Sequence, residues 1–420
     1  MDVQRAIDRV PPEIMHEILA QTVVAVSPQA AHADVPWYLG QISTSWRRAA
    51  LNTGVLWAGI GVDERRYCPK AMEERLKRSG YVLLNVIFAY GHNARDRDVL
   101  EMLVREAARW EAATLELTPG DFNAVAGVRG KLGRLHYLSL TVGDFEEYTQ
   151  TANQTNPFEI CPQLRDLVIG GLEGLRHPLV LPFEQLEHLH APWDATLPDL
   201  VLGRTPNLHS VSLVWTLQYP RLGAATTPLR LPLLQRLEIE HRQCPLNSNS
   251  LDLLDRVNLP QLVYLSVTRP ASADPFVRLV ARGGVRALRT LRIVGVTRET
   301  PETLRGVLNA APTTSRLELC FTPYSRRGDG VLAGLTVCAD VEDTTGPNVE
   351  SLLLELQRGT FDETAAVNMI ESRFRTGATR TCVRLKDVKV VANTLKTRSQ
   401  KILKKLENEG LKVGLDVKIA

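Results

Sequence analysis

The sequence predicts an α/β protein in which a short N-terminal helical module precedes an irregular solenoid of strand-containing repeats. Two observations lead to this prediction. A Leu-x-x-Leu-x-Leu pattern, or a close variant of it, recurs nine times between residues 135 and 354, and amphipathic helix patterns separate several of these motifs. The first 60 residues lack the motif and place apolar residues at helical spacing instead. Since a repeat array grows without a single core, 420 residues do not demand several domains.

Composition and charge exclude several classes of protein. The chain is 44% apolar and 23% charged, which is typical of a folded globular protein. No apolar run approaches the roughly 18 residues that cross a bilayer. The N-terminal stretch MDVQRAIDRVPPE carries charges where a signal peptide needs apolar residues. The net charge of +3 does not indicate a nucleic-acid binder, although lysines gather near the C-terminal end. We therefore expect neither a membrane nor a nucleic acid as a partner.

The cysteines indicate a reducing compartment. They are far apart and form no Cys-x-x-Cys pair, whereas zinc sites usually take two ligands from one tight turn. A disulfide framework belongs to short secreted chains, so reduced thiols in the cytoplasm or nucleus are expected. The cysteines are Cys68, Cys161, Cys244, Cys320, Cys338 and Cys382.

Two apolar helices and a short apolar run are predicted before residue 62. Two prolines open the stretch VPPEIMHEILAQ, in which apolar residues four apart predict one apolar helix face. Pro36 opens a second predicted helix, which places Leu39, Ile42 and Trp46 on one face and ends at Asn52-Thr53-Gly54. Three tryptophans within 21 residues are more apolar surface than so small a unit can bury. Part of that surface is therefore expected to meet the next domain or a partner.

The residues in this module resemble a known family. Pro-Pro-Glu-Ile, then Leu-Gly-Gln-Ile-Ser-x-x-Trp-Arg, then Ala-Leu-Asn-Thr-x-x-Leu-Trp follow one another as in the F-box of the large fungal family of F-box proteins. The resemblance covers residues 8–62. It implies docking to the Skp-type adaptor of a cullin–RING ubiquitin ligase, in which other subunits transfer ubiquitin. The adaptor contacts that it implies are Pro11, Pro12, Ile14, Ile18, Leu19, Leu39, Ile42, Trp46, Leu51, Leu56 and Trp57.

The repeats indicate a leucine-rich-repeat-like solenoid over residues 66–392. Most successive central positions of the motif are 22 to 29 residues apart, which is the period of a unit made of one strand and a return segment. The usual Asn or Cys ladder after the last Leu is missing, so the turns should vary in length. We expect the strands on the concave side and the helices on the convex side. The central positions are Leu138, Leu167, Leu189, Val211, Leu237, Leu265, Leu291, Leu317 and Leu352.

Several segments between the strands read as convex-side helices. DPFVRLVARGG, TPETLRGVLNAAP and TFDETAAVNMIESRFRTG have helix starts and apolar spacing. NTLKTRSQKILKKLENEG predicts a last amphipathic helix, stopped by Gly410, before a closing strand. Residues 393–420 are therefore interpreted as a capping unit, since an exposed solenoid end would otherwise be adhesive.

An unidentified target protein is expected on the concave side. Strand alternation sends the leucines of each motif into the core and their neighbours to the concave surface. These neighbours mix both signs of charge and include tyrosines, which suits a protein more than a phosphate. The candidate target-binding residues are Tyr137, Asp166, His188, His190, Arg236, Glu238, Tyr264, Arg292, Arg316 and Glu318.

Three functions fit these patterns. The chain could be a substrate receptor docked to the adaptor, a repeat scaffold in which the N-terminal helices only cap the solenoid, or an enzyme built on a repeat fold. The sequence contains no GxSxG elbow, Walker loop or HExxH motif. His188 and His190 face the same side of one predicted strand, but no further metal ligand is near in sequence. We therefore expect no catalytic activity, no cofactor and no metal.

Overall fold

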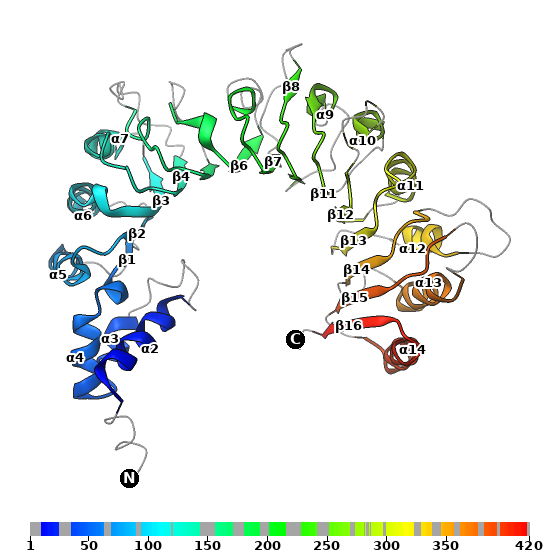
Figure 1. Ribbon diagram of the computed structural model, residues 1–420, viewed down its shortest axis with the longest axis horizontal. Coiled ribbons are helices and arrows are strands. Elements are labelled where there is room, and N and C mark those ends of the chain that lie inside the picture. The colour runs from blue at the N-terminus through cyan, green and yellow to red at the C-terminus, as the bar shows by residue number, and fades with distance from the viewer. Residues whose placement is uncertain are drawn as a thin grey trace, which may run out of the picture. The chain divides into compact units, whose positions relative to one another are not determined.

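In the computed structural model the chain forms two compact units, Met1–Leu189 and His190–Ala420. In each unit, parallel strands form a sheet and helices line one face of it (Figure 1). The residues that the structure describes are 10–24, 35–62, 69–89, 94–118, 121–142, 156–170, 180–193, 201–215, 228–241, 252–268, 274–280, 282, 285, 287–296, 300–322, 329–337, 346–356, 362–376, 382–392 and 395–417.

The N-terminal module packs short helices around a small apolar core. Trp57 lies in this core, and its indole N–H donates to the Ala50 carbonyl oxygen at 2.8 Å. The core side chains are Met15, Leu19, Ala49, Ala50, Leu56 and Trp57, and Val10, Leu39 and Trp46 pack against them. The elements are α2 (Pro12–Val24), α3 (Val35–Leu39), α4 (Thr44–Asn52) and the 3-10 turn η1 (Gly54–Trp57).

The second predicted helix of the module is in fact two helices. The chain turns between residues 40 and 42, and the Ser43 hydroxyl then accepts a hydrogen bond from the backbone N–H of Trp46 at 3.2 Å. Serine is a favoured N-cap because its oxygen satisfies a backbone N–H that the first helical turn leaves unpaired. The break therefore follows from a capping signal that apolar spacing alone does not reveal. The predicted stop is confirmed, since α4 ends at Asn52.

The first unit carries a parallel sheet whose strands follow chain order from β1 to β5. Its first strand lies inside the range 8–62 that the sequence pattern assigned to the module, because Gly59 to Val62 pair with Asn85 to Phe88. The module therefore passes directly into the sheet. The strands are β1 (Gly59–Val62), β2 (Leu84–Phe88), β3 (Trp110–Leu117), β4 (Tyr137–Val142) and β5 (Asp166–Gly170). The helical elements are α5 (Pro69–Ser79), α6 (Ala94–Arg105), η2 (Ala107–Arg109), α7 (Asp121–Val125), η3 (Ala126–Val128) and η5 (Phe183–Gln185).

The second unit repeats the same plan, with its helices packed on one another in chain order from α9 to α14. The strands of its main sheet are β7 (Ser210–Trp215), β9 (Arg236–His241), β11 (Tyr264–Thr268), β12 (Thr290–Val294), β13 (Arg316–Phe321), β14 (Ser351–Leu356), β15 (Asp387–Ala392) and β16 (Lys412–Val417). A separate short pair joins β8 (Leu229–Arg230) and β10 (Val257–Asn258). The helical elements are η6 (Leu202–Arg204), α9 (Asp252–Arg256), α10 (Asp274–Leu279), α11 (Thr300–Ala310), α12 (Asp329–Leu335), α13 (Glu363–Thr376) and α14 (Thr397–Asn408). Strand β6 (His188–Trp193) contains the boundary between the units.

Strand register confirms that the predicted central positions are equivalent within each unit. In the first unit Leu138 pairs with Leu167. In the second unit one row joins Val211, Leu237, Leu265, Leu291, Leu317 and Leu352. The rows also extend to strands without the motif, through Ile60, Val86 and Ala113 in the first unit and Val388 and Val413 in the second. Strand β15 escaped prediction because valines and lysines replace its leucines.

Burial along the strands follows the predicted alternation in most repeats. In β12 and β14 the central leucines are buried and their neighbours are half-buried. Strand β13 departs from the pattern, because every residue after Arg316 is buried, including the carboxylate residue Glu318. Among the described residues, no helix is long and apolar enough to cross a membrane.

Arg373 is a buried cation that ties together irregular parts of the second unit. Its side chain is 1% exposed, and its guanidinium donates to the Leu335 carbonyl oxygen at 2.7 Å and to the Gly346 carbonyl oxygen at 3.0 Å. Burial lowers the pKa of this group. Leu335 ends α12 and Gly346 begins the turn into β14, so one side chain fixes both ends of a variable return segment.

We predict that Arg373→Met lowers the free energy of unfolding of the second unit by about 2–4 kcal/mol, because it leaves two buried carbonyl groups without their donor. Urea unfolding followed by circular dichroism measures this change. Arg375→Met, on the exposed side of the same helix, is the control and should leave the unfolding midpoint in place. Equal urea unfolding midpoints for the two variants would show that the hydrogen bonds of Arg373 do not stabilise the second unit.

Candidate functional site

The N-terminal module exposes apolar side chains that a self-contained core would bury. Ile14 and Ile18 lie one turn apart on α2 and are 52% and 41% exposed. Ile42, in the turn after α3, and Leu51, in α4, are 48% and 38% exposed. We name these four residues the exposed apolar set. Large apolar side chains gathered in one small module mark a surface that meets something else.

The predicted adaptor contacts fall into three groups. Pro11 and the exposed apolar set are accessible. Leu39 and Trp46 are half-buried against the core, whereas Leu19, Leu56 and Trp57 are at most 3% exposed and leave no side-chain surface for a partner. The side chain of Pro12 lies outside the described residues. Sequence spacing did not separate these groups, because α2 has two apolar stripes and only packing shows which one faces inward.

The structure adds two aromatic residues that the predicted contacts omitted. Trp37 is 43% exposed and Tyr38 is 61% exposed, both on α3. The available signal was the excess of tryptophan in this stretch, which indicates exposed apolar surface without saying which indole remains exposed.

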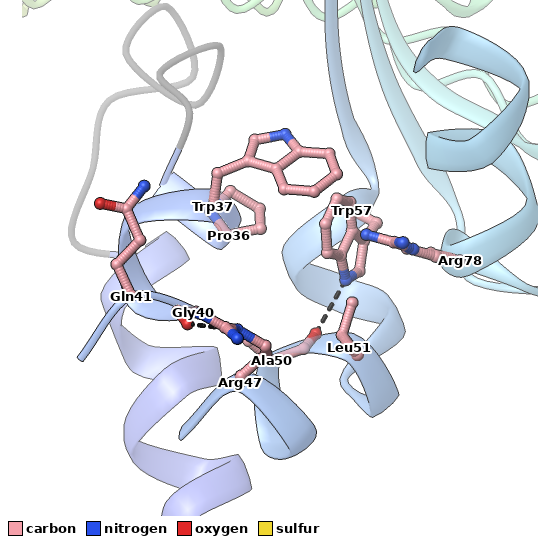
Figure 2. A pocket seen from close by; sticks show the side chains of 9 residues that line it. All are labelled: Pro36, Trp37, Gly40, Gln41, Arg47, Ala50, Leu51, Trp57 and Arg78. Carbon is pink, nitrogen blue, oxygen red and sulfur yellow. Dashed lines mark hydrogen bonds between the residues drawn. The ribbon is translucent and has the colours of Figure 1, made fainter. Parts of the chain in front are cut away.

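A pocket of about 280 Å³ opens beside these residues, where the module meets the first helix of the repeat array (Figure 2). The Trp37 and Trp57 rings meet edge to face with their centroids 5.1 Å apart. Figure 2 shows Arg78, from α5, beside the Trp57 ring, and its guanidinium carbon is 4.6 Å from that ring and 5.0 Å from the Trp37 ring. The lining residues are Pro36, Trp37, Gly40, Gln41, Arg47, Ala50, Leu51, Trp57 and Arg78.

The two arginines of the pocket differ in their hydrogen bonding. Arg47 donates through Nε to the Gly40 carbonyl oxygen at 2.8 Å, which closes the turn between α3 and α4. Arg78 donates through Nε to Glu74 at 2.9 Å. Its Nη1 atom is buried and has no hydrogen-bond partner among the described residues. A buried donor in this state is costly unless a ligand or solvent molecule accepts its hydrogen bond.

The second candidate surface is the helix-free face of the sheet in the second unit. Arg236 donates to Glu238 at 2.7 Å on the same strand, and its guanidinium carbon is 3.8 Å from the centre of the Tyr264 ring on the neighbouring strand. Parallel register places these side chains in adjacent rows. Stacking and ion pairing together hold Arg236 and Tyr264 in one arrangement.

A charged network continues this surface across the next strands. Arg316 donates to Glu318 at 2.8 Å, and Arg292 lies 3.7 Å from Glu318 and donates to Glu355 at 3.0 Å. Burial alone would lower the pKa of Arg292, but Glu355, Tyr264 and Glu318 together raise it above its ordinary value. Arg292 therefore stays charged, and all three arginines are already paired with carboxylates. We name Arg236, Glu238, Tyr264, Arg292, Arg316, Glu318 and Glu355 the charged ladder.

The structure brings together six of the ten predicted target-binding residues in the charged ladder and adds Glu355. Glu318 is more deeply buried than predicted, at 6% exposed, and it pairs with Arg316 on its own strand and with Arg292 on the neighbouring strand. In the first unit, His188 Nε2 lies 3.8 Å from the Asp166 carboxylate, and Tyr137 is half-buried. His190 is half-buried and belongs to the second unit. No group of three His, Cys, Asp or Glu residues could hold a metal in the described part of the chain.

Comparison with known proteins adds little to this picture. No protein-family model matches the chain, and no curated protein matches its sequence. A structure of a protein from Bacteroides fragilis aligns with 79% of this chain and 73% of its own, at 12% identity and a TM-score of 0.35. A chain from the yeast Rad7 and Elc1 complex aligns with 89% of this chain and 92% of its own, at 14% identity and a TM-score of 0.36. Similarities this distant carry no argument about function.

We predict that two cysteines resist alkylation in the folded chain. Burial raises the pKa of Cys161 to about 12, and burial together with hydrogen bonding to Glu355 raises the pKa of Cys320 to about 12. A thiol with such a pKa is ionised in roughly one molecule in ten thousand at pH 8, and only the thiolate reacts.

Iodoacetamide labelling at pH 8, resolved by peptide mass spectrometry, measures this protection. Both cysteines should react at least about a hundredfold faster after unfolding in urea, where their pKa values return to the ordinary range. Labelling at equal rates in the folded and the unfolded chain would show that these thiols are not buried.

Proposed function

We propose that the chain is the substrate-recognition subunit of a Skp–cullin–F-box ubiquitin ligase. The observation that carries the proposal is the exposed apolar set, on a module whose sequence over residues 8–62 resembles an F-box. Such a module would bury these side chains against a Skp-type adaptor and link the chain to a cullin–RING ligase. The compartment that fits this role is the cytoplasm or the nucleus.

The repeat array would hold the target protein on the charged ladder. Its arginines and glutamates are paired with one another, so they present fixed hydrogen-bonding edges beside an aromatic ring rather than a surplus of one charge. Paired charges of this kind contribute more to specificity than to affinity. The proposal assigns no chemical step, cofactor or metal to this chain, which would supply proximity and orientation for transfer by other subunits.

A second function is a repeat scaffold without a ligase. The observation in its favour is the close junction between the module and the array, where η1 packs on α5 and Arg78 stacks against Trp57. A capping module would make such contacts. A cap is expected to be polar on its outer side, however, and the exposed apolar set favours docking.

We predict that the double variant Ile14→Ala, Ile18→Ala binds a purified Skp-type adaptor at least about tenfold more weakly than the wild-type chain, because each truncation removes apolar area from the interface. Isothermal titration calorimetry or co-elution after co-expression measures this loss.

The matched control is the double variant Ile160→Ala, Leu233→Ala. These residues are 48% and 41% exposed, and both lie outside the module. The control should bind the adaptor like wild type. A folded wild-type chain that fails to bind the adaptor would leave the scaffold as the leading function.

We predict that Tyr264→Ala removes target recognition while adaptor binding is retained, because the variant deletes the ring that Arg236 stacks on. The measurement is quantitative proteomics of ubiquitinated proteins in cells that express the variant or the wild-type chain. Tyr81→Ala is the control, since Tyr81 is 98% exposed and lies outside the ladder. Identical sets of ubiquitinated proteins for Tyr264→Ala and wild type would show that the target does not bind at Tyr264.

A further inference from the structure

We propose that strand β16 pairs edge to edge with the β16 of a second copy of this chain, which gives an antiparallel dimer with two-fold symmetry. The dimer goes beyond the proposed function and does not depend on it.

No described strand pairs with the outer edge of β16. Figure 1 shows β16 at the end of the sheet, next to β15. The Lys412 N–H donates to the carbonyl oxygen of Lys386, just before β15, at 3.1 Å. Since successive residues of a strand direct their N–H and C=O groups to opposite edges, Val413 and Leu415 direct theirs to the outer edge. A row of unpaired backbone groups of this kind is a template for another strand.

The apolar side of β16 is also incompletely covered. Val413 and Leu415 lie on the helix side of the sheet, in register with the buried residues Val388 and Val390 of β15. Although α14 packs on this strand, Val413 is only half-buried and Leu415 is 44% exposed. A further strand at this edge would remove apolar surface from water, which is the main favourable contribution to protein association.

The sequence of β16 is complementary to itself in the antiparallel direction. Two copies that pair about Gly414 place Lys412 of each copy opposite Asp416 of the other. The same register places Val413 opposite Leu415, and their outward N–H and C=O groups can then form reciprocal hydrogen bonds. Lys412 and Asp416 occupy non-hydrogen-bonded positions, where opposed side chains are closest. Both side chains are exposed, and neither has an ion-pair partner among the residues that the structure describes.

These charges favour a second copy over an unrelated strand. Charged residues on an edge strand usually oppose pairing. In the register about Gly414 each charge meets its opposite, whereas a strand without an acid and a base at matching positions leaves Lys412 and Asp416 unpaired. Glycine also places no side chain at the symmetry axis, where two identical side chains would meet. A two-fold axis normal to the sheet keeps the helices of both copies on one face and both charged ladders on the other.

The first measurement is the association of the full chain. Pairing through one strand buries less surface than a permanent dimer does, so we expect a dissociation constant in the micromolar range. Sedimentation velocity at chain concentrations between about 1 and 200 μM brackets that range.

Charge reversal tests the register. Lys412→Glu and Asp416→Lys each create two like-charged cross-strand pairs in the symmetric dimer, and each should weaken association at least about tenfold. In an equimolar mixture of the two variants every cross-strand pair is again of opposite sign, so the mixture should associate about as strongly as wild type. Lys77→Glu is the control, because Lys77 is exposed and lies in the first unit. It should associate like wild type.

Hydrogen exchange locates the interface independently of the variants. In the wild-type chain, peptides from β16 should exchange more slowly above the dissociation constant than below it, because the outward N–H groups become hydrogen-bonded. Thermal melting checks that each charge-reversal variant is folded.

Weaker association of both variants, with recovery in their mixture, supports the dimer. A wild-type chain that stays monomeric across the concentration range overturns it, and so does a dimer that neither charge reversal weakens. A mixture that associates no better than the separate folded variants would also overturn the antiparallel register about Gly414.

Discussion

The in-register parallel pairing of the strands is the constraint on which the rest of each unit depends. A shift of one residue would turn every leucine of a strand from the helix side to the open side, so burial of the leucine row fixes the register. In the second unit that row continues from Val211 to Val413. Because the register is fixed, the residues flanking the leucines also line up, and one further row runs through Arg236, Tyr264, Thr290 and Arg316. The charged ladder is thus a consequence of core packing.

The leucine row fixes the strands but not the return segments between them. In irregular repeats these segments therefore need other stabilising contacts. The return segments of the second unit differ in length, and a buried polar side chain anchors the two ends of one of them. Arg373 joins the end of α12 to the turn before β14. Gly346 in that turn has a φ of +64°, which a residue with a side chain rarely adopts. In the first unit, the Arg109 guanidinium donates to the Val82 carbonyl and to Ser79 at 2.7–3.0 Å, and so holds the turn after α5.

The sequence predicts the features that follow from a single strong local signal. The motif leucines and the stop of α14 at Gly410 are confirmed, and Gly410 has a positive φ. Features that depend on competition between similar signals were not predictable. Both apolar stripes of α2 have the same spacing, and tertiary packing alone buries Met15 and Leu19 while Ile14 and Ile18 stay exposed. The pairing of Arg292 with Glu355 joins residues 63 positions apart, which no local pattern encodes.

The tryptophans show how one compositional signal divides into two roles. The excess of aromatic residues before residue 62 predicted surface for a partner or for the next domain. The structure packs one tryptophan against the first repeat and leaves another partly exposed. Trp57 is 1% exposed and links α4 to Arg78 of the first repeat, whereas Trp37 meets the same guanidinium and stays 43% exposed. The exposed Trp37 therefore packs on Trp57 and Arg78, the same two residues that join the module to the array. A partner bound there would contact both, so its orientation would be transmitted to the start of the repeat array without a flexible linker.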